Sequence, residues 1–387
     1  MIGVNGQWRL SASIGTIKDF LSGDQLTDFQ IIERAGGELP QFEMTFSTSN
    51  KEVMYNMNEG NPLTISIGRT ADNMMDYRLW ILNPKVKRNG QSEYVFNLSG
   101  LAYHPSYVND CHQQITKLMS GVEVMAGVAQ RNNMKFDTNL PASVDKMKWI
   151  QPYTTDRAFV NSTWLRTDVG LNNVPLIGIT SDSIFRFRSL KSMLSLAPSY
   201  LFNYGASSPE QKAASVQIPI EGEYTIQLSN GLLNQFAGYG LETLEYNLDS
   251  GGSIGKSSTV STLLAASKTL GRNADVKIRR VPNSFVGDNV HARYNESYIN
   301  NLNYLCSYSA CTVDVSFKNE FYPVRLLDLV LFKDDELEVN NQNKQTSETY
   351  TGMYLVNMVA RRIINGDMVT RVEMSREAPA ALKGNVR

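Results

Sequence analysis

Six side chains could bind a metal or carry thiol chemistry, and they fall into two groups far apart in the sequence. They are His104, Cys111 and His112, followed by His291, Cys306 and Cys311. A zinc site needs four ligands, usually in closely spaced pairs, and this spacing matches no such pattern. Small buried thiols explain Cys306 and Cys311 better than a redox pair does. We therefore predict no metal site and no redox chemistry.

A stretch rich in glycine, at 251–257, suggests a loop that holds nucleotide phosphates. Such a loop cradles phosphates with backbone amides and a lysine, and it requires a glycine six residues before that lysine. The lysine here is Lys256, and Ser250 stands where the glycine is needed. The sequence predicts a flexible surface loop and no cofactor.

Charged clusters could serve hydrolysis or nucleic-acid binding. Glycosidases use two carboxylates, and four lie together in an expected loop: Asp334, Asp335, Glu336 and Glu338. A run of this kind is typical of a solvated surface. A second cluster is basic and comprises Arg272, Lys277, Arg279, Arg280 and Arg293. Because it lacks interleaved aromatic residues that could stack on bases, a protein interface or an ordinary surface is favoured over nucleic-acid binding. No histidine stands beside a glycine-bracketed serine, so we predict no catalytic residue.

The composition sets the scale of the elements that position these residues. A chain of 387 residues should hold two to four domains, and 42% hydrophobic residues are enough to fold them. With 37 Lys+Arg against 38 Asp+Glu, strong binding to nucleic acid or acidic membranes is disfavoured. The first ten residues lack a signal peptide's apolar segment, and no apolar stretch reaches the roughly 20 residues of a membrane helix. We expect no export signal and no membrane segment.

Hydrophobic periodicity predicts strands first and helices next. Apolar and polar residues alternate between 41 and 103, which predicts antiparallel β structure, with Asn89-Gly90 forming a type I′ hairpin turn. Spacings of three and four predict an amphipathic helix over 110–130. A second helix should begin at Asp156 as its cap, bury Phe159 and Trp164, and end at Gly170.

The second half of the sequence mixes strands with long loops. We expect strands within 181–190 and 216–228, and a helix over 294–308. The Gly- and Ser-rich stretch 249–262 and the basic stretch 272–284 should be loops, with one helix at 260–270 between them.

The end of the chain repeats the pattern of its beginning. Leu79 aligns with Leu355, and Asn89-Gly90 aligns with Asn365-Gly366, at a constant offset of 276 residues (355 − 79 and 365 − 89). Further pairs match with changed loops: Phe42 and Phe46 with Val313 and Phe317, and Leu63 and Ile67 with Leu327 and Leu331. This indicates an internal duplication, although two unrelated meanders with Asn-Gly hairpins could align as well.

The order of these parts is similar to that of a known family. An aromatic segment enters a helix at Trp149, Tyr153, Asp156, Phe159, Trp164 and Gly170; a helix and strand follow at 295–305 and 326–330; and a last hairpin runs from Gly352 through Arg361 and Arg362. The chain resembles the baseplate hub proteins of contractile phage tails and the hub part of type VI secretion spike proteins.

The resemblance implies an α+β, mainly β fold, with two related antiparallel β-barrel tube domains separated by inserted α/β domains. The implied division is 1–103 for the first tube domain, 104–180 for an α/β insertion, 181–230 with 306–377 for the second tube domain, 231–305 for a loop-rich insertion and 378–387 for a tail. The hairpin residues Leu79, Asn89, Gly90, Leu355, Asn365 and Gly366 would be structural.

The implied function is structural and non-enzymatic. A homotrimer would form a pseudo-six-fold ring that joins the hexameric tail tube to a trimeric central spike, with tape-measure protein and DNA passing through its channel. Baseplate wedge proteins are further candidate partners. Because the chain stops at Arg387, where a fused spike would continue, we expect the spike on a separate chain. The protein would be made in host cytoplasm and reside in the virion.

Three alternatives stay open. The first is a hub of a contractile injection or secretion particle. The second is a tail-associated cell-wall hydrolase. The third is a monomeric carbohydrate-binding β protein, suggested by 18 tyrosines and by Trp8, Trp80, Trp149 and Trp164, although such residues equally fit cores and interfaces.

Overall fold

The computed structural model describes most of the chain. The described residues are 2–4, 8–68, 74–90, 92–141, 144–170, 173–204, 216–220, 222–228, 241–247, 252–258, 279–286, 290–291, 293–309, 311–318, 321–334, 350–364 and 366–376. Asn365, Gly251, the acidic residues after Asp334 and the expected helix at 260–270 lie outside them.

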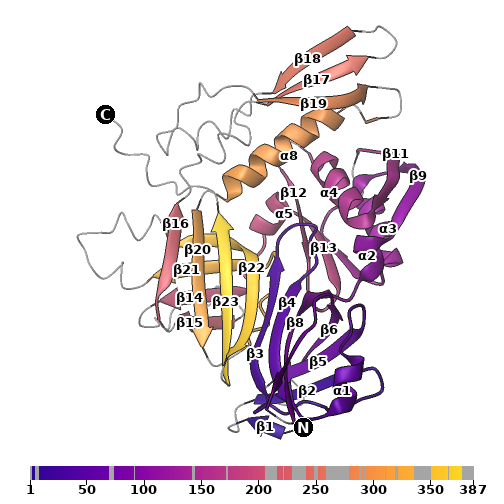
Figure 1. Ribbon diagram of the computed structural model, residues 1–387. Helices are drawn as coiled ribbons and strands as arrows, with labels where there is room; N and C mark the ends of the chain where they lie inside the picture. The colour runs from indigo at the N-terminus through magenta and orange to yellow at the C-terminus, as the bar shows by residue number, and fades with distance from the viewer. Residues whose placement is uncertain are drawn as a thin grey trace.

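The N-terminal part forms an antiparallel β-unit around its own core (Figure 1). Its strands are β1 (Ile2–Val4), β2 (Trp8–Ile14), β3 (Leu26–Arg34), β4 (Gln41–Thr48), β5 (Pro62–Gly68), β6 (Met75–Ile81), β7 (Lys85–Asn89) and β8 (Glu93–Ala102), with α1 (Lys51–Asn56) beside them. The alternation predicted for β4 is confirmed, since Phe42, Met44 and Phe46 are buried. This period-two burial places one face of each strand on the core.

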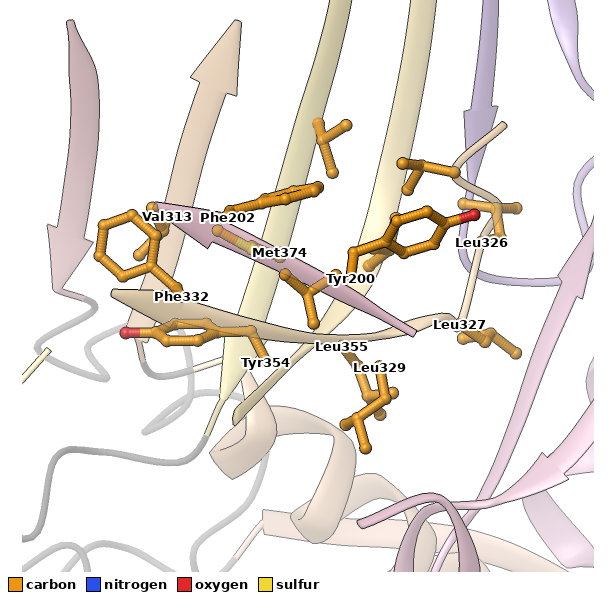
Figure 2. Close-up of a cluster of buried hydrophobic side chains, with 14 of the residues drawn as sticks. Tyr200, Phe202, Val313, Leu326, Leu327, Leu329, Phe332, Tyr354, Leu355 and Met374 are labelled. Carbon is orange, nitrogen blue, oxygen red and sulfur yellow. The ribbon is translucent and has the colours of Figure 1, made fainter. Parts of the chain in front are cut away.

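The C-terminal part forms a second β-unit with a separate core. Its strands are β14 (Tyr200–Tyr204), β15 (Val216–Ile220), β16 (Tyr224–Leu228), β20 (Cys311–Lys318), β21 (Leu329–Asp334), β22 (Gly352–Ile364) and β23 (Asp367–Arg376). Figure 2 shows Phe202, Phe332 and Tyr354 packed together in this core. Pairing of β3 with β22 joins the two units into one continuous sheet.

The insertion between the units contains helices and two small sheets. Its elements are α2 (Pro105–Asn109), β9 (Cys111–Met119), α3 (Gly121–Arg131), β10 (Lys135–Thr138), β11 (Met147–Thr155), α4 (Asp156–Arg166), β12 (Pro175–Ile179), β13 (Ile184–Ser189) and α5 (Leu190–Leu194). Because β13 pairs with β10 and β12, it belongs to this insertion, and the expected domain boundary at 180 falls inside its sheet.

The helix predicted over 110–130 is half wrong. Residues 111–119 form β9, which pairs with β11, and only 121–131 form the helix α3. Ile115 and Leu118, whose helical spacing suggested burial, are 66% and 67% exposed on the strand. Ser120 caps α3 and forms a capping box with Glu123, a sequence signal that marks where the helix begins.

A three-stranded sheet replaces the loops expected late in the chain. It consists of β17 (Leu241–Asn247), β18 (Gly252–Ser258) and β19 (Arg279–Val286). Lys256 therefore lies in a strand, and the loop predicted there is wrong. The helix predicted at 294–308 is confirmed as α8 (Tyr294–Tyr308).

The two β-units repeat one strand order. Five strands pair as β3-β4-β8-β6-β5 and as β16-β20-β23-β22-β21, antiparallel throughout. One row across the first unit runs Ile31, Phe42, Gly100 and Ile81, and the matching row across the second runs Ile226, Val313, Met374 and Val356. The predicted matches of Phe42 with Val313 and of Phe46 with Phe317 are thus confirmed.

Other predicted matches are wrong by one or more residues along the strand, and a shift of one residue moves a side chain to the opposite face. Leu79 lies two residues before Ile81, so Tyr354 corresponds to it, and Leu355 points to the opposite face. Leu63 pairs with Leu79 as Val330 pairs with Tyr354, so Leu327 is not its counterpart. The repeat is present in the strand pairing, but a constant offset does not describe it.

The two hairpins also differ. The first ladder ends at the pair Asn89–Glu93, which leaves three residues between the strands and not the two of a type I′ turn. The second ends at the pair Ile364–Asp367, with two residues between. Gly90 and Gly366 both have positive φ, +67° and +91°, which glycine adopts without strain. Asn89 therefore corresponds to Ile364.

Candidate functional site

The junction between the two β-units is an antiparallel ladder of seven residue pairs. It runs from the pair Met358–Arg34 to the pair Ile364–Asp28. At its outer end Arg362 donates two hydrogen bonds to Asp28, of 3.0 Å from Nε and 2.7 Å from Nη2. These bonds are the main cause that raises the pKa of Arg362. The ladder fixes the register of one unit against the other.

A buried ion pair lies on the same ladder. Arg361 Nη1 stands 3.4 Å from Glu33 Oε1, and the two side chains are only 4% and 2% exposed. Arg361 also donates to the carbonyl oxygens of Tyr322, at 3.3 Å, and Val324, at 2.5 Å. The backbone N–H of Ser181 donates to Glu33 at 3.0 Å. The pair thereby connects β3, β22, the segment before β21 and the insertion.

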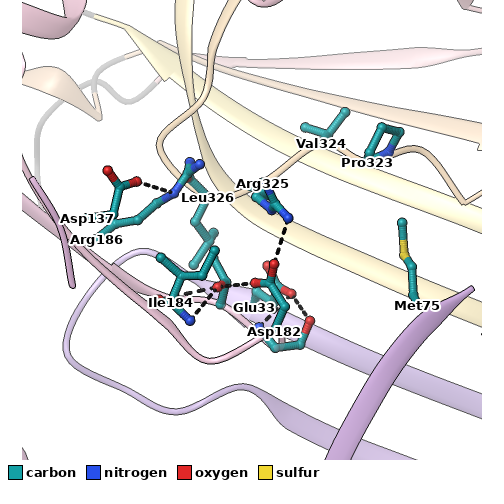
Figure 3. A network of polar contacts seen from close by, with 12 residues as sticks. Glu33, Met75, Asp137, Asp182, Ile184, Arg186, Pro323, Val324, Arg325 and Leu326 are labelled. Carbon is teal, nitrogen blue, oxygen red and sulfur yellow. Dashed lines mark hydrogen bonds and ion pairs between the residues drawn. The ribbon is translucent and has the colours of Figure 1, made fainter. Parts of the chain in front are cut away.

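More ion pairs tie the insertion to the second unit. Figure 3 shows Arg325, which precedes β21, reaching Asp182 of the insertion; it also shows Arg186 of β13 beside Asp137 within the insertion. Arg186 also pairs with Asp328 at 2.7 Å and donates to the carbonyl oxygen of Leu326. Because Arg186 is nearly buried, these contacts offset the cost of taking its charge out of water. The junction is therefore held by charged groups as well as by the ladder.

The segment similar to the hub family surrounds a buried carboxylate. Thr155, and not Asp156 as predicted, caps α4. Asp156 is the first helical residue, and it accepts hydrogen bonds from Arg131 Nε at 2.7 Å, Asn132 at 2.6 Å and Gln151 at 3.1 Å. Burial alone would raise the pKa of Asp156, but the bonds outweigh burial and hold it below its usual value. The carboxylate links α3, β11 and α4.

The remaining residues of this segment do not gather at one point. Phe159 is buried, and the indole N–H groups of Trp149 and Trp164 donate to the carbonyl oxygens of Met119 and Pro175. Tyr153 is 72% exposed and has a φ of +52°. Gly170 has the expected positive φ, but it follows the end of α4 by four residues and does not end the helix. These side chains build the insertion and form no reactive cluster.

The histidines and cysteines considered for metal or thiol chemistry have different surroundings where the structure describes their side chains. Among the described residues, no three His, Cys, Asp or Glu side chains gather in a way that could hold a metal. His104 contacts the Asn132 carbonyl and Ser183, and burial lowers its pKa. Cys111 is exposed and Cys311 is buried. Asp334 is buried and accepts a hydrogen bond from Tyr224, so it is not the solvated residue that its acidic neighbours suggest.

The described helices include none long and apolar enough to span a membrane.

Comparisons with known proteins identify the fold. No protein-family model and no curated protein matches the sequence. A tail protein from Neisseria meningitidis MC58 matches with a TM-score of 0.59 at 9% identity, over 97% of this chain and 98% of that one. The 43 kDa tail protein of prophage MuSo2 from Shewanella oneidensis matches with a TM-score of 0.59 at 10% identity, over 95% and 98%.

A third solved structure comes from a secretion system. It is an Escherichia coli component of the type VI secretion system, described as structurally similar to bacteriophage T4 tail proteins gp27 and gp5. It matches with a TM-score of 0.50 at 10% identity, over 96% of this chain and 80% of that one. The mainly β fold expected from the resemblance is confirmed: over nearly its whole length, this chain has the fold of phage tail proteins and of a type VI secretion component.

Proposed function

We propose that this chain is a structural hub protein of a phage tail baseplate. The observation that carries the proposal is the repeated row of five strands, found twice in one chain whose fold is that of tail proteins. A hub must place similar surfaces around an axis, and an internal repeat supplies two such surfaces in each subunit. The ion pairs at the junction would keep the two surfaces in fixed register.

The proposed assembly is a homotrimer in the virion. Three chains with two similar β-units each present six similar units, so one ring can join a hexameric tail tube to a trimeric spike. In this ring, residues 1–103 supply the first tube unit, and the strands β14–β16 and β20–β23 supply the second. The insertion joins them. Tape-measure protein and DNA would pass through the channel, and wedge proteins would bind outside. The near-zero net charge favours passage over retention of DNA.

The fold likeness to the type VI secretion component supports a second setting, a hub of a contractile injection or secretion particle. The two settings share the assembly and differ in their neighbouring genes. A cell-wall hydrolase receives less support. Glycosidases use two carboxylates. A cleft lined by Glu33, Asp76 and Asp182 has enough of them, but these carboxylates are bonded to Arg361, Ser66 and Arg325.

Light scattering of the purified protein, with electron-microscope class averages of the same sample, tests the proposal. We expect three times the mass of one chain and a ring with a central hole. A monomer at micromolar concentration, both alone and with its spike protein, would contradict the trimeric hub and favour the enzyme and carbohydrate-binding alternatives.

A further inference from the structure

We propose that neighbouring chains join by pairing β16 of one copy with β7 of the next, in the register of the intrachain junction. The inference rests on the proposed trimeric hub and adds the surface, the partner strand and the contacts. Two strand edges carry it. Among the described strands, β7 pairs with β8 alone and β16 pairs with β20 alone.

Comparing the two β-units shows which neighbouring strand β7 and β16 lack relative to their counterparts β22 and β3. In the second unit, the first part of β22 pairs with β21 and its last part, 358–364, pairs with β3. In the first unit, β6 pairs with β5 in the same way, and β7 continues toward the hairpin with no second neighbour among the described strands. Likewise β3 pairs with β22 along one edge, whereas the matching edge of β16 has no neighbour among the described strands. Among its described strands, each chain thus contains one filled copy of the contact and two halves that could form a second copy between chains.

The matching rows fix the register of the open copy. Ile31 corresponds to Ile226, so Asp28 corresponds to Glu223, the residue directly before β16. Asn89 corresponds to Ile364, so Lys87 corresponds to Arg362. Applying the register of the β3·β22 ladder to β16 and β7 gives five opposed pairs. They are Lys85–Gln227, Val86–Ile226, Lys87–Thr225, Arg88–Tyr224 and Asn89–Glu223.

The chemistry of the two edges is complementary in this register. The ion pair Arg362–Asp28 of the filled contact maps onto Lys87 and Glu223, which are both exposed and keep the same signs. Val86 is 46% exposed, and it would meet the half-buried Ile226. Exposed lysines on an edge strand also discourage random pairing with other strands, and here an acidic partner lies where pairing is intended.

A second copy of this chain is therefore the partner. The contact is heterologous, because one chain offers β16 and the next offers β7, so successive copies either close into a ring or grow into a filament. Three copies would close with three β7·β16 contacts alternating with the three β3·β22 junctions. In such a ring each unit would meet both neighbours through the same type of ladder.

Disulfide trapping tests the register. In a Cys111→Ser background, Lys85→Cys with Gln227→Cys places two thiols directly opposite and leaves Lys87 and Glu223 intact. Opposed residues in antiparallel strands lie roughly 4.5–5.5 Å apart between Cα atoms, which suits a disulfide. Under mild oxidation we expect cross-linked dimers and trimers, and no larger species, on non-reducing gels. The control, Lys85→Cys with Thr225→Cys, shifts the pair by two residues and should cross-link at least about fivefold less.

Charge reversal tests the ion pair independently. Lys87→Glu or Glu223→Lys alone should raise the concentration at which half the chains are assembled about tenfold, and the two together should restore it. A trimer by light scattering that neither cross-links at 85 and 227 nor responds to either charge reversal overturns this inference and leaves the hub proposal standing. Chains that cross-link at 85 and 227 into an extended ladder overturn the trimeric hub and leave the strand contact standing.

Discussion

The two arginines that follow one another on β22 differ in how much water reaches them. The side chain of Arg361 is 4% exposed and bonded to Glu33, whereas that of Arg362 is 42% exposed and bonded to Asp28. Removing one partner of a buried pair leaves an uncompensated charge, so Arg361→Ala should lower the free energy of unfolding by about 3–5 kcal/mol. Arg362→Ala should cost about 1 kcal/mol or less. Urea unfolding of both variants measures the difference, and equal costs would contradict this assignment of burial.

Asp156 should make stability depend on pH. Its pKa is lowered in the folded protein, so its contribution is present above the unfolded value of about 3.9 and is lost as the pH falls through the lower folded value. In the Asp156→Asn variant, the amide side chain at position 156 has no carboxyl group to titrate. The stability difference between the natural protein and this variant should be constant from about pH 7 to pH 5 and should shrink below about pH 4.

Urea unfolding at several pH values measures that difference. A difference that stays constant down to about pH 3 would show that Asp156 is not held ionised by its hydrogen-bond donors. The exposed carboxylate of Glu59 provides the control, because Glu59→Gln should change stability little at any pH.

Sequence patterns identify single residues poorly where partners come from distant segments. Glu33 and Arg361 meet only because β3 and β22 pair, and no spacing rule relates residues on two such strands. The prediction of Asp156 as a helix cap was wrong by one residue. Thr and Asp both favour the cap position, and the Arg131 side chain that draws Asp156 inward belongs to another helix.

At the scale of elements, the capping box at the start of α3 should decide the boundary between β9 and the helix. Ser120 accepts from the Glu123 N–H at 3.3 Å, and the Glu123 carboxylate accepts from the Ser120 N–H at 2.7 Å. Ser120→Ala should cost about 1 kcal/mol. The exposed Ser162, in the middle of α4, gives a matched control, because Ser162→Ala removes no cap. Thermal unfolding compares the two, and an equal loss in both would contradict the role of the cap.

Elements whose hydrophobic residues follow a single periodicity were predictable from the sequence. Elements whose hydrophobic residues fit both helical and strand spacing were not. The strands β4 and β8 and the helix α8 follow their patterns because one face of each is buried against a core. In β9 the spacing of Ile115 and Leu118 fits a helix by coincidence, since both are exposed on a two-stranded ribbon. The predicted repeat was right in its strand order, but Leu79 corresponds to Tyr354 and not, as predicted, to the next residue, Leu355. The longer first hairpin changes the offset from 275 in the strand before the turn (356 − 81 and 364 − 89) to 274 in the strand after it (374 − 100), without changing the pairing.

At the scale of the whole molecule, the proposed contact between β7 and β16 allows a test of whether the ring contains an odd or an even number of chains. A chain with Lys87→Glu keeps a natural β16, and a chain with Glu223→Lys keeps a natural β7. When the two variants are mixed, every contact between unlike chains is complementary, either natural or fully swapped in sign. Contacts between like chains place two charges of the same sign at positions 87 and 223, which is unfavourable.

Unlike chains can alternate around a ring only if the number of chains is even. A ring of three must contain at least one like contact, so an equal mixture of the two single variants should form closed trimers much less readily than the natural chain. The double variant, in which both changes lie on one chain, should close normally. Light scattering with electron-microscope class averages distinguishes these outcomes. If the mixture closes as well as the double variant does, the ring has an even number of chains and the three-fold hub is wrong; if only the double variant closes, heterologous pairing of β7 with β16 around an odd-numbered ring explains why.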